Sequence, residues 1–258
     1  MNASHALHVQ VGNPVRWDRV DAWRGVAMVW MTVFHFCFDL SHFGWWPQNF
    51  RADPFWTLQR TAIVSMFLFC AGWGQAIAWH QGLAWVRFWR RWAQVVACAL
   101  LVSMGSAWMF PRSFIYFGVL HGMAVMLLLV RLTAPWGRHL WWLGGVAVLL
   151  PHAANGLLHG PWAGAAPFMD ARWLNWLGLV SRKPFTEDYV PVLPWLGVMW
   201  WGMASGQWMI RHRQGWMSGP VPAGGAWLAV LGRWSLSYYM LHQPIMIGAL
   251  MAVGWWLR

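Results

Sequence analysis

Charged side chains are scarce in this sequence. Asp, Glu, Lys and Arg make up 10% of its 258 residues and hydrophobic residues 59%, whereas a soluble domain carries about 25% charged residues. Mean hydropathy is +0.40. Apolar runs near the length that crosses a bilayer as a helix, about 20 residues, recur along the whole chain. This pattern excludes an ordinary soluble domain and predicts an all-α, polytopic membrane helical bundle.

Cysteines and long polar segments are also few. The three cysteines, Cys37, Cys70 and Cys98, all fall in apolar runs, which argues against a disulfide framework. The first 18 residues are polar and lack an apolar core, so we expect a short tail and no signal peptide. We therefore predict a cytoplasmic N-terminal tail over residues 1–20 and a single transmembrane domain over 21–258.

Acidic residues number only 7, against 18 Lys and Arg, which gives a formal net charge of +11. In a soluble protein this excess would suggest nucleic acid. Here the charges lie between apolar runs, so we expect membrane topology and lipid headgroups to explain them, and no nucleic acid partner. A polyanionic ligand at the cytoplasmic face would use the same charges.

We predict about seven spans, at roughly 21–43, 56–79, 91–110, 113–132, 138–158, 191–210 and 235–256. An N-in, C-out orientation puts the larger share of the basic residues inside, as the positive-inside rule requires. The predicted inner residues are Arg16, Arg19, Arg24, Arg87, Arg90, Arg91, Arg131, Arg138, Arg211, Arg213 and Arg233. The predicted outer residues are Arg51, Arg60, Arg112, Arg172, Arg182, Lys183 and Arg258.

The first span carries three ionisable residues in its apolar run. Arg24 and His35 are eleven positions apart, which on a helix puts them on nearly one face and about 16 Å apart along the axis. Asp39 follows His35 by four positions, one turn further along the same face. Ionisable groups at membrane depth are costly, so they are candidates for function. The alternative is a histidine satisfied by packing and an aspartate at a helix end.

The last span is unusually polar in its inner half. It contains Tyr238, His242 and Gln243, and Tyr238 and His242 share a face at i, i+4. Another histidine, His121, falls inside the predicted span 113–132. We expect His35, His121 and His242 at comparable depth on three helices, with His121, Tyr238, His242 and Gln243 lining the site.

The segment between the second and third predicted spans is basic and aromatic. Arg87, Arg90 and Arg91 alternate there with Trp85, Phe88 and Trp89, which predicts a short amphipathic element at the headgroup level. Arginine also offers phosphate oxygens a fork of donors. Binding to the membrane surface and binding to a phosphorylated ligand are both open for this segment.

Several blocks of the sequence resemble a known family. Arg24-Gly25 followed by His35 resembles the Arg-x10-His signature of the transmembrane acyltransferase superfamily. The blocks VDAWRGVAMVWMTVFHFCFDL, FLFCAGW, FGVLHGMAV, DYVPVLPWLGV and GRWSLSYYMLHQP, in this order, resemble its bacterial branch related to heparan-alpha-glucosaminide N-acetyltransferase. The resemblance covers most of residues 16–250.

This resemblance implies an activity and some roles. The family takes an acyl group, usually acetyl, from cytosolic acyl-CoA and passes it to an acceptor across the membrane, typically an amine or hydroxyl of a sugar. Its first-span histidine is taken as the catalytic residue, and His35 matches that position; Arg24 matches the arginine placed near the donor. For a bacterial member, the implied location is the inner membrane.

The chemistry of the residues is compatible with acyl transfer. Coenzyme A carries three phosphate groups, for which Arg24, Arg87, Arg90, Arg91, Arg211 and Arg233 are the predicted contacts. His35 can act as a general base or as a transient acyl carrier. Asp39 can hold the imidazole in one tautomer, and Tyr238 or Arg24 can stabilise an oxyanion.

Other classes of protein remain as alternatives. Histidines on different helices can ligate a b-type haem, which a visible absorption spectrum would reveal. A proton-coupled transporter or lipid flippase would use His35 and Asp39 as a proton relay. A three-histidine zinc site is a third alternative, although we expect no metal. A homo-oligomer is left open.

Overall fold

The structure, a computed structural model, describes residues 17–222 and 224–256. Helices make up 76% of the described residues, which form no β-strand. The prediction of an all-α fold is therefore confirmed. Most of the predicted tail, including Arg16, and the final Arg258 lie outside the described residues.

Seven long helices coincide with the seven predicted spans. They are α1 (Asp18–His42), α2 (Pro54–His80), α3 (Trp85–Met109), α4 (Val119–Thr133), α5 (His139–His159), α7 (Val192–His212) and α10 (Ser235–Trp256). Short elements connect them: α6 (Ala166–Met169), α8 (Gln214–Ser218), α9 (Ala226–Arg233) and the 3-10 turns η1 (Ala134–Trp136), η2 (Ala163–Ala165) and η3 (Asn175–Leu177).

Four helices in the described chain are long and apolar enough to cross a membrane. They are α2, α3, α4 together with η1, and α10. Large apolar side chains such as Leu100, Met104 and Trp108 on α3, and Leu241 and Ile245 on α10, lie exposed. Apolar surface of this extent is unfavourable in water and suited to lipid. The protein is therefore a membrane protein, and the full count of seven spans stays a prediction.

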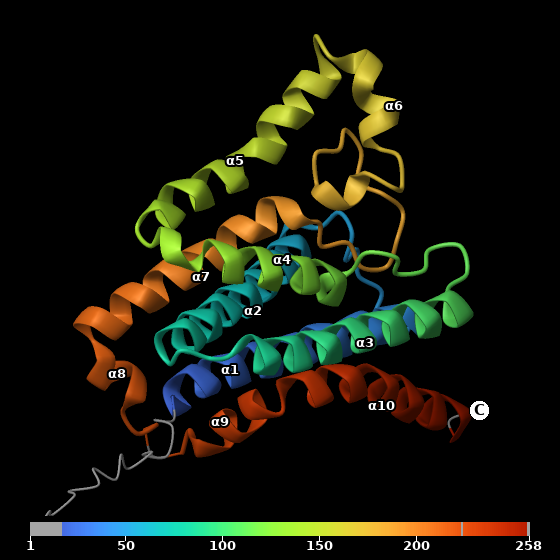
Figure 1. The fold of residues 1–258 in the computed structure, drawn as a ribbon. Coiled ribbons are helices and arrows are strands. Elements are labelled where there is room, and N and C mark those ends of the chain that lie inside the picture. Colours follow the sequence, from blue (N-terminus) through green and yellow to red (C-terminus); the bar gives the residue numbers. More distant parts are fainter. Residues whose placement is uncertain (1–16, 223, 257–258) are drawn as a thin grey trace, which may run out of the picture.

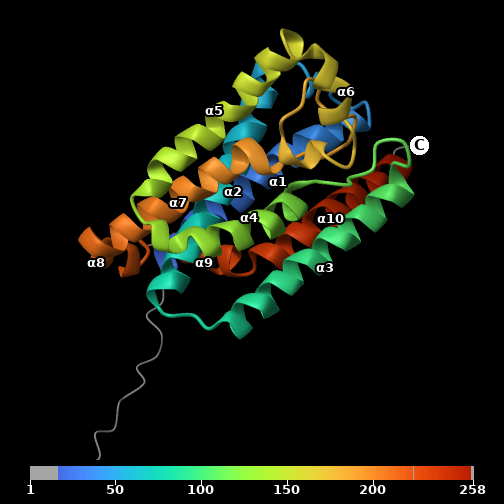
Figure 2. The same cartoon turned by 45° about the horizontal axis from the view of Figure 1, so that its top comes forward.

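The helices form a bundle with one protruding arm (Figures 1 and 2). α2 packs along α7, α1 packs on α9 and on α2, and α5 packs on α7. In both views α3 and α10 run side by side. The far end of α5 and the short α6 rise away from the other helices (Figure 1). α10 also packs on α1, so the first and last long helices of the chain are in contact.

Three elements differ from the sequence-based prediction. α3 begins at Trp85, so the arginines of residues 87–91 belong to its first turns instead of to a separate amphipathic element. α4 begins only at Val119 and not near residue 113. Pro111 cannot continue the preceding helix, and Gly118 has an extended conformation with φ −93 and ψ −167. α9 was missed because an eight-residue helix has too short a pattern to recognise.

Two glycines bring the backbones of α1 and α9 together. A Cβ atom at Gly25 would overlap the carbonyl of Leu228, and one at Gly232 would overlap the carbonyl of Asp21. Small residues at such crossings permit the close approach that dispersion forces require between membrane helices. Because α10 begins two residues after α9 ends, this contact also fixes the start of α10 against α1.

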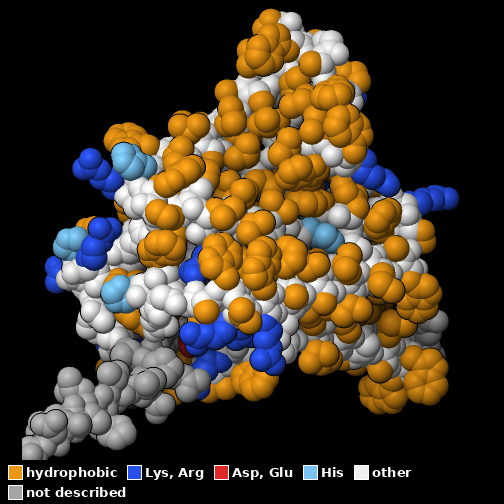
Figure 3. Space-filling model, viewed as in Figure 1, with side chains coloured by type: hydrophobic (Ala, Val, Ile, Leu, Met, Phe, Trp, Pro, Cys, Tyr) orange, Lys and Arg blue, Asp and Glu red, His pale blue; other side chains and the backbone are white. Residues whose placement is uncertain are grey.

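Ten arginines gather at one end of the bundle, which we call the arginine end. It contains the beginnings of α1, α3, α5 and α10 and the ends of α2, α4 and α7, as Figure 1 shows. Figure 3 shows basic side chains clustered there, over the beginning of α3, while apolar side chains cover the flank. The described residues of this end include Arg19, Arg24, Arg87, Arg90, Arg91, Arg131, Arg138, Arg211, Arg213 and Arg233.

We expect Gly232→Ala to lower the melting temperature of the purified protein, because the added methyl group must push α9 away from α1. Overpacking of this kind costs about 1–3 kcal/mol. The matched control is Gly105→Ala on α3, where an added Cβ has nothing within 4 Å. Equal melting temperatures for the two variants would contradict this account of the crossing.

We also expect the arginine end to face the cytoplasm, because inner loops carry the excess of Lys and Arg. Single cysteines placed at Arg87 and at Arg182 in a cysteine-free background should react on opposite sides of sealed vesicles. Labelling of residue 87 from the periplasmic side would reverse the predicted orientation.

Candidate active site

Two histidines from opposite ends of the chain meet between α1 and α10. The rings of His35 and His242 lie 5.2 Å apart, centroid to centroid, at an interplanar angle of 61°. His242 is only 7% exposed. Nδ1 of His35 and Nε2 of His242 are buried and have no hydrogen-bond partner. The sequence-based prediction placed both residues in the site, and the structure brings them into contact.

The tautomer of His242 follows from its hydrogen bond. Its Nδ1 lies 2.8 Å from the backbone carbonyl oxygen of Tyr239. A carbonyl only accepts, so Nδ1 must carry the proton and donate it. Nε2 of the neutral ring then keeps a free lone pair, which is what a general base needs.

Tyr238 holds the ring of His242 in place. Its own ring stacks on His242 at 5.8 Å and 7°, which confirms that the two residues share a face. Its hydroxyl lies 2.7 Å from Oγ1 of Thr32, and Thr32 donates to the carbonyl of Met28. The Tyr238 hydroxyl therefore donates to Thr32, and an oxyanion would have to replace Thr32 as its acceptor.

Asp39 is bound by Gln243 and not by His35. Gln243 donates from Nε2 to Oδ1 of Asp39 at 2.8 Å, and Asp39 is 2% exposed. Among the described residues no hydrogen bond joins Asp39 to His35, and Nδ1 of His35 has no partner. The predicted orienting bond is wrong because the side chain of Asp39 turns toward α10.

The five residues His35, Asp39, Tyr238, His242 and Gln243 form what we call the paired-histidine site. Besides the two histidine nitrogens, Oδ2 of Asp39 and Oε1 of Gln243 are buried without partners. Nearly all buried polar groups in proteins are hydrogen-bonded, and an unpaired one is costly. Four unpaired polar atoms therefore lie within about one helical turn of each other, and a polar ligand would supply their missing partners.

The six arginines predicted to bind phosphate all lie at the arginine end. Arg24 is half-buried, pairs with Asp21 at 2.9 Å, and reaches the side of α2 at Gly74. It lies about 16 Å along α1 from His35, too far for an oxyanion there. The other five arginines are exposed: Arg87, Arg90, Arg91, Arg211 and Arg233. Their side chains form hydrogen bonds only within their own helices, if at all, and so have donors free for a ligand.

His121 lies apart from the pair. Because α4 starts at Val119, His121 occupies its first turn. Its Nδ1 accepts from the backbone N–H of Gly118 and its Nε2 lies 3.0 Å from Oγ of Ser103. These contacts hold the start of α4 against α3. The structure does not bring His121 to the paired-histidine site.

An apolar groove of about 450 Å³ lies near the site on the other side of α1. Trp30, Phe34 and Cys37 line it from α1, and Phe55 and Trp56 line it from α2. The ring of Phe34 also makes an edge contact with His35 at 5.7 Å. Phe34 thus separates the groove from the histidines. In the described chain no three His, Cys, Asp or Glu side chains are placed to hold a metal ion.

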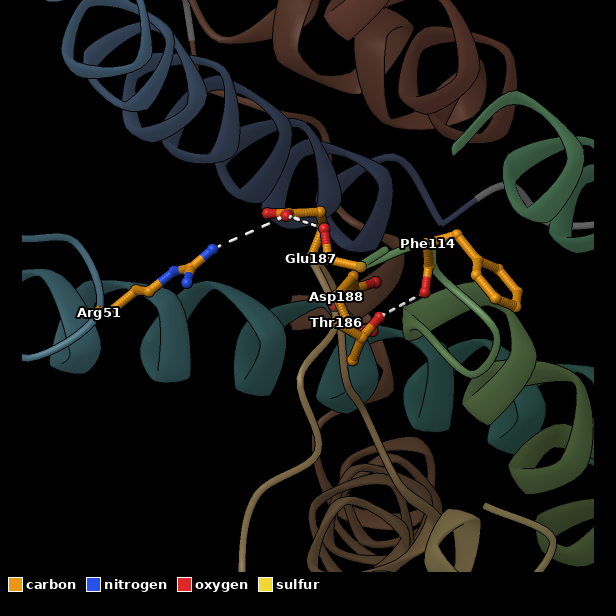
Figure 4. A network of polar contacts seen from close by, with 6 residues as sticks. Arg51, Phe114, Thr186, Glu187 and Asp188 are labelled. Carbon is orange, nitrogen blue, oxygen red and sulfur yellow. Dashed lines mark hydrogen bonds and ion pairs between the residues drawn. The ribbon is translucent and has the colours of Figure 1, made fainter. Parts of the chain in front are cut away.

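The loop before α7 carries a second polar cluster, drawn in Figure 4. Glu187 accepts from Oγ of Ser113 and lies 3.7 Å from Nη2 of Arg51. Asp188 accepts the backbone N–H of Val119 through Oδ2 at 2.7 Å and so caps the first turn of α4. Both acidic residues thus join segments that are distant in the sequence. Asp188 supplies the side-chain cap that Gly118, at the start of α4, lacks.

The sequence-based search missed two residues that matter here. Thr32 lies one turn before His35 and binds Tyr238. Arg131 was used only to judge topology, although it is 5% exposed. A single arginine at the end of the apolar run MAVMLLLVRL is the signal that would have singled it out.

Comparisons with known proteins give one match. The family model described as heparan-alpha-glucosaminide N-acetyltransferase, catalytic, matches residues 16–244. Comparison with curated proteins and with solved structures found no match. The matched range runs from the start of α1 through Pro244 in α10 and so includes the whole paired-histidine site.

Asp188 should make the stability of the protein depend on pH. Burial raises the pKa of its carboxyl, outweighing the Val119 N–H and the charges of Lys183 and Arg60, which lower it. The folded protein therefore holds this proton more tightly than the unfolded chain. The stabilisation is full below the ordinary pKa of about 3.9 and is lost as the pH rises through the folded-state pKa.

We compare the melting temperature of Asp188→Asn with that of the unaltered protein at two pH values. The difference, variant minus unaltered protein, should be larger at about pH 7 than at about pH 4. Asparagine keeps an acceptor for Val119 and carries no charge. Asp188→Ala carries no charge but lacks the acceptor, so it should be about 1 kcal/mol less stable than Asp188→Asn at either pH. A difference between Asp188→Asn and the unaltered protein that does not change with pH would contradict this.

Proposed function

Because the chain belongs to the catalytic family of heparan-alpha-glucosaminide N-acetyltransferase, we propose that it transfers an acyl group from cytosolic acyl-CoA to an acceptor at or across the membrane. Acetyl-CoA is the proposed donor. The proposed acceptor is an amine or hydroxyl of a glycan or a small sugar-like molecule. We place the protein in the bacterial inner membrane, and association with a second copy stays a prediction.

The observation that carries this proposal is the contact of His35 with His242 between α1 and α10. Two imidazole nitrogens lie there buried and unpaired, away from the arginines and within the apolar part of the bundle. A neutral imidazole is the group that can take up and return a proton near neutral pH. Because the rings are in contact at 5.2 Å, they leave no space for a haem between them.

The transfer step balances with these groups. An imidazole takes the proton from the acceptor O–H or N–H while the acceptor atom bonds to the thioester carbonyl carbon. The bond from that carbon to sulfur breaks, and the leaving thiolate takes the proton from the imidazolium. His35 is the proposed catalytic residue, and His242, whose Nε2 keeps a lone pair, is the second histidine of the reaction.

Asp39 and Gln243 have a supporting task. Oδ2 of Asp39 and Oε1 of Gln243 are acceptors in need of donors, and a sugar offers hydroxyl groups beside its reacting atom. The carboxylate charge also favours the imidazolium that forms one turn away. Asp39 thus acts on the acceptor and on the charge of the site, without orienting His35 directly.

The donor is proposed to enter from the arginine end. Arg24, Arg87, Arg90, Arg91, Arg211 and Arg233 are the proposed contacts for the phosphates of CoA. Arg24 lies about 16 Å from His35 along α1, so the flexible pantetheine arm would extend along the bundle toward the histidines. In this arrangement the phosphates never leave the headgroup region.

The test is incubation of the purified protein with radiolabelled acetyl-CoA and a panel of amines and sugars, with release of free CoA as the readout. We expect His35→Ala to lower the rate about 10²–10⁴-fold, the range of general acid–base catalysis. CoA binding should remain. The matched control is His42→Ala, an exposed histidine two turns further along the same helix.

Label that stays on the protein after denaturation would identify a covalent acyl-histidine in place of simple base catalysis. If His35→Ala retained activity within a few-fold of the unaltered protein, the assignment would move to His242. If the protein neither hydrolysed acetyl-CoA nor transferred its acetyl group, the proposed function would be wrong.

A further inference from the structure

Arg131 is a buried cation whose charge nothing neutralises in the described chain. It lies in the last turn of α4 and is 5% exposed. One nitrogen, Nη2, donates to the carbonyl of Leu83. Nε and Nη1 are buried and have no hydrogen-bond partner, and the described residues place no carboxylate in an ion pair with it.

Two tryptophans enclose the guanidinium. Its central carbon lies 5.5 Å from the ring centroid of Trp79, at the end of α2, and 5.4 Å from that of Trp85, at the start of α3. The rings attract the cation through their faces but accept none of its in-plane hydrogen bonds. The two rings are 42% and 43% exposed, so only side chains at the surface separate the guanidinium from the solvent or headgroup layer.

A purely structural arginine would be expected to use its donors. Arg131 is near the C-terminal carbonyls of α4, where a cation is favoured by the helix dipole, yet it donates one bond only. The unmet donors require an acceptor with several oxygens and negative charge. A phosphate has that chemistry, and the fork of an arginine matches it in two parallel bonds.

We propose that Arg131 is the anchor of a phosphate-binding site formed by the end of α2, the start of α3 and the end of α4. The proposal rests on the proposed function as far as the phosphate belongs to acyl-CoA; the headgroup of an anionic lipid is the other source of the same chemistry. Trp79 and Trp85 form the walls, and rotation of either exposed ring opens the guanidinium. The exposed arginines of the same end draw the anion there.

The experiment compares the unaltered protein with Arg131→Gln and with the matched control Arg138→Gln. Arg138 is an exposed arginine at the same end, at the start of α5. The first arm of the experiment, in neutral detergent, measures the affinity for CoA and for dephospho-CoA by calorimetry. We expect Arg131→Gln to weaken CoA binding about tenfold or more, as loss of a charge-assisted bond does. Arg138→Gln should bind nearly as the unaltered protein does.

A smaller loss with dephospho-CoA would assign the contact to the 3′-phosphate, and an equal loss would assign it to the diphosphate. The lipid arm measures melting temperature in nanodiscs of phosphatidylcholine with and without phosphatidylglycerol, in the absence of CoA. Stabilisation by phosphatidylglycerol that Arg131→Gln abolishes would assign the site to lipid. If the unaltered protein showed this effect but bound no CoA, the phosphate site would stand and the proposed function would fail.

Arg131→Lys covers the case in which Arg131→Gln does not fold. Lysine keeps the charge but lacks the fork, so it should bind the same ligand more weakly than arginine does. If Arg131→Lys and every folded Arg131 variant matched the unaltered protein in both arms, the proposal would be overturned, and Arg131 would be a brace between Leu83 and α4.

Discussion

The contact of α1 with α9 at Gly25 and Gly232 is the constraint on which the paired-histidine site depends. The two glycines let one backbone lie on the other, and α10 follows α9 after a single residue. His35 and His242 are 207 positions apart in the sequence, with rings in contact. Their meeting requires α10 to leave α9 at a fixed angle and height along α1. A methyl group at the crossing would press α9 away from α1 and shift the start of α10, on which the position of His242 depends.

Buried polar atoms have their hydrogen bonds made in some parts of the bundle and left unmade in others. At Asp188 and His121 the polar groups complete the first turn of α4 and their bonds are made. In the paired-histidine site and at Arg131 the bonds are left unmade. At these two places a polar ligand would supply the missing hydrogen-bond partners.

Much of the fold could be read from the sequence, because apolar length alone marks a helix in a membrane protein. All seven predicted spans correspond to long helices. The shared face of Tyr238 and His242 followed from spacing within one helix. The partner of Asp39 did not, because whether a side chain turns to His35 or to Gln243 depends on how α1 and α10 are docked. The start of α4 was misplaced because Pro111 and Gly118 delay it, which hydropathy does not register.

The capping of α4 by Asp188 also sets an order of assembly during synthesis. Val119 and Asp188 are 69 positions apart in the sequence, so α4 leaves the ribosome long before its cap exists. Until α5 and the loop as far as Asp188 have been made, the first turn of α4 has an unpaired N–H that lipid does not satisfy. The insertion machinery must shelter that end of the helix, or leave it at the water interface, until the later segment arrives.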